Sequence, residues 1–285
     1  ILALAEKFEP TVKKRSCLSL LEGKILGTMF FQPSTRTRLG FQSAMLRLGG
    51  QILDFGSVEA SRSGYSGESI PDTARVMSDL VDIVTIRHEE VGFPAGYAKH
   101  SEIPVINGGD GIGPHSQHPT QAMVDLYAMK RFLQRIDGLS VLMVGGLFHR
   151  TAHSLATGLA RFEGVKLYLC GPDDTWWSEE EERELVDSGL SMERVKSVED
   201  AIPHVDVVYH NAFRKSPYGS VPEPYRTTAQ KLSLAQEHAI VLHPLNRGDE
   251  LATDVDNTPH ARYFEQSGMG IAIRMAVLSR ALGIS

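Results

Sequence analysis

The chain has 285 residues, a length that at about 150 residues per domain predicts two domains. Lys and Arg total 29 against 35 Asp and Glu, which gives a formal net charge of −6. This charge argues against a general nucleic-acid binder, but it does not exclude a local basic pocket for a small anion. Cys17 and Cys170 are too few for a disulfide scaffold or a four-thiolate zinc site. No stretch reaches the ~18 apolar residues of a membrane helix. We therefore expect a cytoplasmic protein that binds neither membrane nor nucleic acid.

Strand-like and helix-like segments alternate along the chain. The opening residues have the pattern of a helix entered partway, so we expect a few residues to precede Ile1. Apolar, β-branched runs predict strands at 25–31, 51–55, 81–86, 105–107, 140–144, 165–170, 205–209 and 240–242. Helical periodicity predicts helices at 41–48, 70–80, 119–133, 151–162, 178–189 and 270–282. Residues 214–230 and 249–260 are expected to be irregular.

This alternation is typical of parallel sheets with helices on both faces. Two such runs are joined by the helix at 119–133. The predicted fold class is therefore α/β, with two doubly wound parallel-sheet domains and the active site in the cleft between them.

Cationic side chains follow most of the predicted strands. In open parallel sheets, ligands bind outside the carboxyl ends of the strands. Five of the six loops expected at those ends contain an arginine, and the sixth contains His118 and Gln121. An acidic protein that places arginine at so many strand ends is expected to bind an anion there.

The turn from Ser34 to Arg38 is the strongest candidate for the anion site. It follows a predicted strand and opens a helix, so backbone N–H groups and the positive end of the helix dipole face the same point. Three hydroxyls add donors, and an arginine fork suits phosphate. The alternative is a capping turn whose arginines form surface ion pairs.

Other strand-end residues carry weaker signals. Arg87 alone fits a surface ion pair equally well, and His118 at a helix start is more often structural than catalytic. His118 could donate to a carbonyl oxygen, and Gln121, one turn further on, could bind an amide. The turn at 145–151 lacks the G-x-G-x-x-G spacing of dinucleotide sites, and no metal-binding motif occurs among the 11 histidines.

Three motifs in chain order carry a resemblance to a known family. They are Phe-Phe-Gln-Pro-Ser-Thr-Arg-Thr-Arg at 30–38, His-Pro-Thr-Gln at 118–121 and His-Pro-Leu at 243–245. Together with Gly67-Glu68, Arg87-His88, 107–111, 150–155 and 252–256, they make nearly the whole chain similar to the aspartate/ornithine carbamoyltransferase family, most closely its aspartate branch.

The resemblance implies a carbamoyl-phosphate domain at 1–125 plus the C-terminal helix 270–285, and an acceptor domain at 126–269. It implies carbamoyl transfer to a small amine or amino acid without a metal or organic cofactor, in a homotrimer or larger assembly with shared active sites. The residues implied to bind carbamoyl phosphate are Ser34, Thr35, Arg36, Thr37, Arg87, His118 and Gln121. Those implied to be catalytic are Arg36, Thr37, Arg87 and His118.

The departures from the family pattern fall on the acceptor side. The neighbouring-subunit loop, which carries lysine in the aspartate branch, contains Arg62 and Ser66 here but no lysine. Ala212 stands where the branch has the arginine that grips the acceptor side-chain carboxylate. The implied acceptor-binding residues that remain are Arg150, Arg214 and Leu245.

These departures leave three hypotheses. A buried carboxylate without its cation is costly, so the first is a carbamoyltransferase whose acceptor is not aspartate. The second is an aspartate carbamoyltransferase of pyrimidine synthesis in which Arg62 or Arg214 takes over the missing roles. The third is a non-catalytic subunit that scaffolds a partner enzyme.

Overall fold

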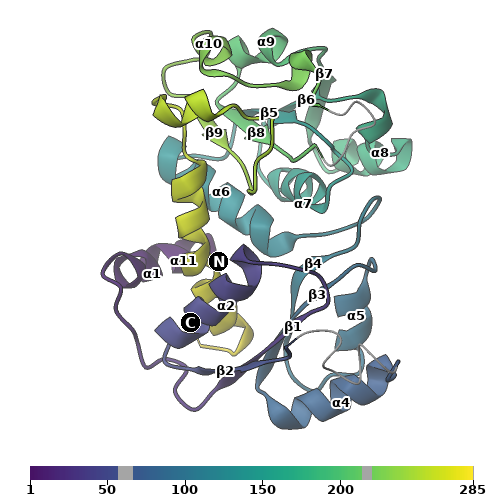
Figure 1. Ribbon diagram of the computed structural model, residues 1–285, viewed down its shortest axis with the longest axis vertical. Helices are drawn as coiled ribbons and strands as arrows, with labels where there is room; N and C mark the ends of the chain where they lie inside the picture. The colour runs from purple at the N-terminus through teal and green to yellow at the C-terminus, as the bar shows by residue number, and fades with distance from the viewer. Residues whose placement is uncertain (57–66, 214–219, 285) are drawn as a thin grey trace. The chain divides into compact units, whose positions relative to one another are not determined.

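The computed structural model describes residues 1–56, 67–213 and 220–284 (Figure 1). Three residues predicted for the acceptor side, Arg62, Ser66 and Arg214, lie outside these ranges. The chain forms two compact units. Unit 1 comprises Ile1–Ile112, Ser116–Met123 and Met269–Ser285, and unit 2 comprises Gly113–His115 and Val124–Gly268.

Unit 1 is built on a four-stranded parallel sheet in the order β2-β1-β3-β4. Its strands are β1 (Ile25–Phe30), β2 (Gln51–Asp54), β3 (Ile83–His88) and β4 (Val105–Asp110). The helices packed in this unit are α1 (Leu2–Lys13), α2 (Arg36–Arg47), α4 (Ile70–Leu80), α5 (Phe93–Ala98) and the later part of α11 (Tyr263–Ala281).

Helices cover both faces of this sheet, and side chains that alternate along β1 contact them on either side. Met29 packs in a buried cluster with Met77 of α4, and a Cβ at Gly27 would lie 3.1 Å from the same Met77 side chain. Thr28, which points to the other face, accepts a hydrogen bond from Gln42 of α2 at 3.1 Å. Adjacent residues of one strand therefore contact α4 and α2 on opposite sides.

Unit 2 contains a five-stranded parallel sheet in the order β7-β6-β5-β8-β9. Its strands are β5 (Ser140–Val144), β6 (Lys166–Cys170), β7 (Ser191–Arg194), β8 (Val207–His210) and β9 (Ile240–Leu242). Its helices are α6 (Pro119–Leu133, from Val124 onward), α7 (Arg150–Leu159), α8 (Glu179–Asp187), α9 (Val198–Ala201) and α10 (Ala229–Leu232).

The predicted class of two parallel-sheet α/β domains is confirmed, with corrections to individual elements. The strand expected at 81–86 begins at Ile83, because Asp82 turns its carboxylate to the Ile25 N–H, 2.8 Å away. The polar edge strand β7 was not expected, since its residues lack an apolar pattern. The last helix begins at Tyr263 rather than 270. None of the described helices is long and apolar enough to cross a bilayer.

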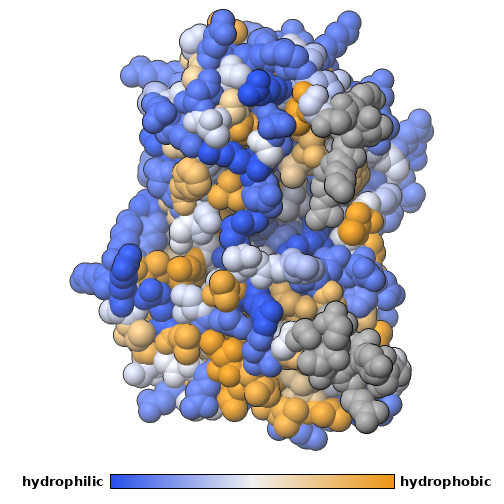
Figure 2. All heavy atoms as spheres, viewed as in Figure 1, coloured by the Kyte–Doolittle hydropathy of each residue, from blue (hydrophilic) through white to orange (hydrophobic). Residues whose placement is uncertain are grey.

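The surface of unit 1 carries exposed leucines on neighbouring elements. Figure 2 shows apolar side chains gathered over α2 and β2. Leu39 and Leu46 of α2 and Leu53 of β2 are 56%, 54% and 44% exposed. Exposed apolar patches of this kind are typical of contact surfaces.

Candidate active site

The turn that was predicted to bind an anion lies between β1 and α2. Thr35 is the N-cap of α2, and within the described residues no side-chain hydrogen bond caps this helix. Ser34 is half-buried, whereas Thr35 and Arg36 are exposed. The first N–H groups of a helix have no partner inside it, so this turn offers backbone donors, hydroxyls and a guanidinium to one ligand. The alternative of a capped turn therefore does not hold for Thr35.

Arg38, the last residue of this predicted anion-binding segment, lies in the first turn of α2 and has a structural partner. Its guanidinium forms an ion pair with Asp54 at the end of β2, with Nε 3.0 Å from Oδ1. Thr28 donates to the same carboxylate at 2.6 Å and Gln42 at 3.1 Å. Burial alone would raise the pKa of Asp54, but the hydrogen bonds from Arg38 and Thr28 hold it below its usual value. The ion-pair interpretation is therefore right for Arg38, which fixes α2 against β2.

Two residues predicted to be catalytic, Thr37 and Arg87, lie beside the ring of a third, His118. Its Nε2 atom lies 3.4 Å from Thr37 Oγ1 and 3.4 Å from Arg87 Nη1. His118 and Thr37 are buried, and Arg87 is half-buried at the end of β3. These contacts are at the outer limit of hydrogen bonding, as is common before a ligand binds. An oxygen atom placed beside the ring would lie near the Thr37 hydroxyl and the Arg87 guanidinium, which can both donate to it, and near His118 Nε2, which donates to it when that nitrogen carries the proton.

Gln121 lies one turn from His118 at the start of α6. Its backbone N–H donates to the His118 carbonyl at 3.0 Å, so the helix start fixes both residues together. Ser34, Thr35, Arg36, Thr37, Arg87, His118 and Gln121 all belong to unit 1.

The loop that carries His118 is braced by residues that the strand-end argument missed. Asn107 accepts from the Gly109 N–H at 2.7 Å and donates to Asp110 at 2.5 Å. Asp110 accepts from the Gly92 N–H at 2.6 Å, and its backbone exchanges two hydrogen bonds with Gln117 at 2.9 and 3.0 Å. In the sequence, this bracing corresponds to the glycine-rich loop and to the 107–111 motif of the resemblance. These hydrogen bonds order the loop backbone that leads to His118.

Gly109 is predicted to be essential for this arrangement. It has φ +116°, and a Cβ there would lie 3.3 Å from His118 Cδ2 and 3.4 Å from Arg87 Nη1. Gly109→Ala is expected to lower kcat/KM for carbamoyl phosphate about 10- to 100-fold, because small displacements of catalytic groups are costly. Steady-state kinetics measure this. The matched control is Gly113→Ala, with φ +92° but nothing within 4 Å of the added Cβ. Equal losses in both variants would show that backbone strain alone is responsible.

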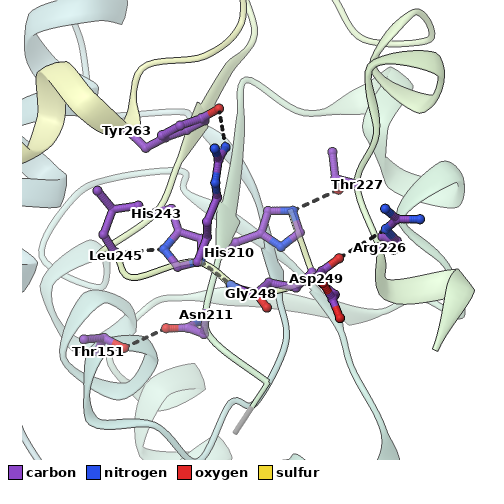
Figure 3. Close-up of polar contacts among 12 residues, drawn as sticks. Thr151, His210, Asn211, Arg226, Thr227, His243, Leu245, Gly248, Asp249 and Tyr263 are labelled. Atoms are coloured by element: carbon purple, nitrogen blue, oxygen red, sulfur yellow. Dashed lines mark hydrogen bonds and ion pairs between the residues drawn. The ribbon is translucent and has the colours of Figure 1, made fainter. Parts of the chain in front are cut away.

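The predicted acceptor residue Arg150 lies in unit 2 as the first residue of α7, where it is 8% exposed. The next residue, Thr151, donates to Asn211 at 2.7 Å, which ties the start of α7 to the end of β8 (Figure 3). A Cβ at Gly145 would lie 2.4 Å from the Asn211 carbonyl oxygen, so only glycine allows these two strand ends to approach. Asn211, which was not among the predicted acceptor residues, therefore braces the helix start that carries Arg150.

The residues that follow β8 carry no cation as far as the structure describes them. Asn211, Ala212 and Phe213 are uncharged, and Arg214 lies outside the described ranges. The other predicted acceptor residue, Leu245, is half-buried in the loop after β9 and packs against the core of unit 2. Within residues 1–56, 67–213 and 220–284, no group of three or more His, Cys, Asp or Glu could hold a metal ion.

His210 is a buried histidine at the end of β8. Its Nε2 lies 2.9 Å from Thr227 Oγ1, and its ring lies parallel to that of His243 at 6.3 Å between centroids (Figure 3). Burial, and then the neighbouring His243, lower the pKa of His210 to about 3. The ring is therefore neutral in the folded protein at any ordinary pH.

The depressed pKa predicts acid sensitivity of unit 2. Below pH 6.5 the unfolded chain binds a proton that folded His210 excludes, so stability falls as pH falls toward 3. His210 is expected to account for a loss of about 2 kcal/mol in the free energy of unfolding between pH 7 and 5. Urea unfolding followed by tryptophan fluorescence measures this in unit 2, which contains both tryptophans, Trp176 and Trp177. In His210→Gln the free energy of unfolding should depend less on pH than in the wild type, whereas in His204→Gln, at an exposed position, the dependence should be unchanged. Equal pH dependence in the wild type and both variants would contradict the role assigned to His210.

Comparisons with known proteins identify the family of the chain. Residues 1–131 match the family model described as aspartate/ornithine carbamoyltransferase, carbamoyl-P binding domain. Residues 137–281 match the Asp/Orn binding domain of the same family. The aspartate carbamoyltransferase catalytic subunit of Archaeoglobus fulgidus is 42% identical over 99% of this chain and 94% of that protein. The same subunit of Thermococcus onnurineus is 41% identical over 100% of this chain and 92% of that protein.

Solved structures show the same similarity in three dimensions. The catalytic subunit of Methanocaldococcus jannaschii aspartate transcarbamoylase is 37% identical, with a TM-score of 0.89 over 99% of this chain and 92% of that one. The Trypanosoma cruzi aspartate transcarbamoylase in complex with carbamoyl aspartate and phosphate is 32% identical. Its TM-score is 0.88, over 97% of this chain and 89% of that one. The chain therefore belongs to the aspartate/ornithine carbamoyltransferase family and is a transferase.

Proposed function

We propose that the protein transfers the carbamoyl group of carbamoyl phosphate to the amino group of aspartate and releases phosphate, as in pyrimidine synthesis. The observation that carries the proposal is the placement of Thr37 Oγ1 and Arg87 Nη1, each 3.4 Å from Nε2 of the buried His118, in the unit that also contains the anion-binding turn. The names of similar proteins support aspartate as the acceptor.

In the proposed reaction the neutral amine attacks the carbamoyl carbon and the bond from that carbon to the phosphate oxygen breaks. The amine nitrogen gives up one proton, which the departing phosphate accepts. Ser34, Thr35 and Arg36 hold the leaving phosphate. Thr37, Arg87 and His118 donate to the carbonyl oxygen as negative charge develops on it, and Gln121 binds the carbamoyl amide. Placement of two reactants and charge stabilisation suffice for this chemistry, so it requires no metal or organic cofactor.

On the acceptor side, Arg150 is proposed to bind the α-carboxylate and Leu245 to contact the bound amino acid. The second carboxylate of aspartate needs a cation that Ala212 does not supply. We assign this role to Arg214, or to Arg62 from a neighbouring subunit, whose loop would also bring Ser66. The Arg62 alternative requires an assembly with shared active sites, which we propose to be a homotrimer or larger and to act in the cytoplasm. The exposed leucines over α2 and β2 fit a subunit contact.

A second candidate is a carbamoyltransferase with a different acceptor. The observation that favours it is the uncharged run Asn211, Ala212 and Phe213 after β8. An acceptor with one carboxylate and a neutral side chain would need only Arg150.

The test is product identification with ¹³C-labelled carbamoyl phosphate and either aspartate or a panel of amino acids and small amines. Mass spectrometry should find the label in carbamoyl aspartate. Label in another product only would establish the second candidate. If no labelled product forms while carbamoyl phosphate binds, the protein is a non-catalytic subunit and both proposals fail.

A further inference from the structure

The loop from His243 to Glu250, which follows β9, is held from within by a buried ionisable pair. The side chains of His243 and Glu250 are 0% and 2% exposed, and His243 Nε2 lies 2.9 Å from Glu250 Oε1. The Leu245 N–H donates to His243 Nδ1 at 2.8 Å (Figure 3). Because Nδ1 accepts this bond, the proton of the neutral ring is on Nε2, which donates it to the carboxylate.

Glu250 also holds the returning arm of the loop. The Gly248 N–H donates to the same Oε1 atom at 2.7 Å, and a Cβ at position 248 would lie 2.9 Å from Oε2. Burial alone would raise the pKa of Glu250, but the hydrogen bonds from His243 and Gly248 hold it below its usual value. One ionised carboxylate therefore orders backbone on both sides of the loop tip.

The two ends of the loop are anchored separately. The His243 N–H donates to Gln266 Oε1 at 2.9 Å, and the Thr227 N–H donates to the Glu250 carbonyl at 2.9 Å. Between these anchors, Leu245 adopts φ +55°, which a leucine keeps only where its surroundings fix it. Among the contacts that hold Leu245, the hydrogen bond from its N–H to His243 comes from the buried pair.

We infer that Glu250 is a positioning residue of the acceptor site, acting through His243 and the Gly248 N–H to fix the backbone at Leu245. The inference rests on the proposed function, in which Leu245 contacts the acceptor. Without the carboxylate, His243 loses the partner that orients its ring, and the Leu245 N–H loses a fixed acceptor. Acceptor binding then weakens. Phosphate binding does not, since its proposed residues belong to unit 1.

The decisive variant is Glu250→Gln, which keeps the size of the side chain and removes its charge. Hydrogen bonds to charged groups are stronger than neutral ones, so the KM for the acceptor is expected to rise about 5-fold in Glu250→Gln and at least about 20-fold in Glu250→Ala. The dissociation constant of inorganic phosphate should stay unchanged in both. The matched control is Glu237→Gln, an exposed carboxylate of unit 2 that should leave every value unchanged.

A double variant separates positioning from general stability. Because Glu250 acts through His243 and also holds the Gly248 N–H, Glu250→Gln combined with His243→Ala should raise the acceptor KM by less than the product of the two single effects. A lowered melting temperature with a wild-type acceptor KM in Glu250→Gln would overturn the inference, whether or not the alanine variant folds. The acceptor in these assays is aspartate, or the amine that product analysis identifies. Absence of any turnover in the wild-type protein overturns the proposed function and this inference together, whereas a wild-type KM in an active Glu250→Gln overturns only the inference.

Discussion

Replacing His118 with alanine is expected to lower kcat about 100- to 1000-fold, because removal of one preorganised donor to a developing oxyanion costs that much. The structure supports this role by placing the buried ring 3.4 Å from both Thr37 and Arg87. The KM for carbamoyl phosphate should change much less, since we propose that the turn at 34–37 holds the phosphate. Steady-state kinetics with both substrates varied measure the two effects separately.

The control for this variant is His100→Ala, an exposed histidine of the same unit, which should keep wild-type kinetics. Circular dichroism of the His118→Ala variant should match the wild type. A kcat within about 5-fold of wild type would mean that His118 braces its loop without acting on the substrate.

The second large effect is on the stability of unit 2. Asp125 of α6 is fully buried, and its carboxylate accepts from Tyr209 Oη at 2.8 Å and from Gln266 Nε2 at 2.6 Å. Asp125→Ala leaves both donors buried without this acceptor, so the free energy of unfolding should fall by about 3–5 kcal/mol. Urea unfolding followed by tryptophan fluorescence reports it, because both tryptophans lie in unit 2.

Tyr209→Phe is the matched comparison. It removes the hydroxyl that donates to Asp125 Oδ2, but Gln266 still donates to Oδ1, so it should cost less than Asp125→Ala, about 2 kcal/mol. The combined variant should cost less than the sum of the two single ones, since Asp125→Ala no longer strands the tyrosine hydroxyl. Equal and additive losses would show that the carboxylate does not organise this network.

Much of the fold follows from local sequence patterns. β5 is a run of apolar residues bounded by polar ones, as expected for a strand covered on both faces. α4 begins with Ser69 as N-cap and Pro71 in the first turn, and both are standard start signals. β7 could not be predicted because it is a polar edge strand that pairs only with β6.

Some residues around the candidate site could also be predicted from local sequence, and others could not. Thr37, Arg87 and His118 were found because parallel strands bring their carboxyl ends to one edge of the sheet. Asp125 and Gln266 were not, since they lie 141 residues apart and neither has a local pattern that marks it. Arg36 and Arg38 look equivalent in sequence, and only the distant Asp54 distinguishes them by pairing with Arg38. Long-range hydrogen bonds that brace a site leave no periodic signal.

The most direct test of carbamoyl transfer is the release of phosphate from carbamoyl phosphate, measured with and without aspartate. Aspartate should stimulate release by the wild-type protein, and His118→Ala should lose this stimulation. Carbamoyl phosphate that binds tightly but releases no phosphate, with aspartate or with any other amine, would contradict it.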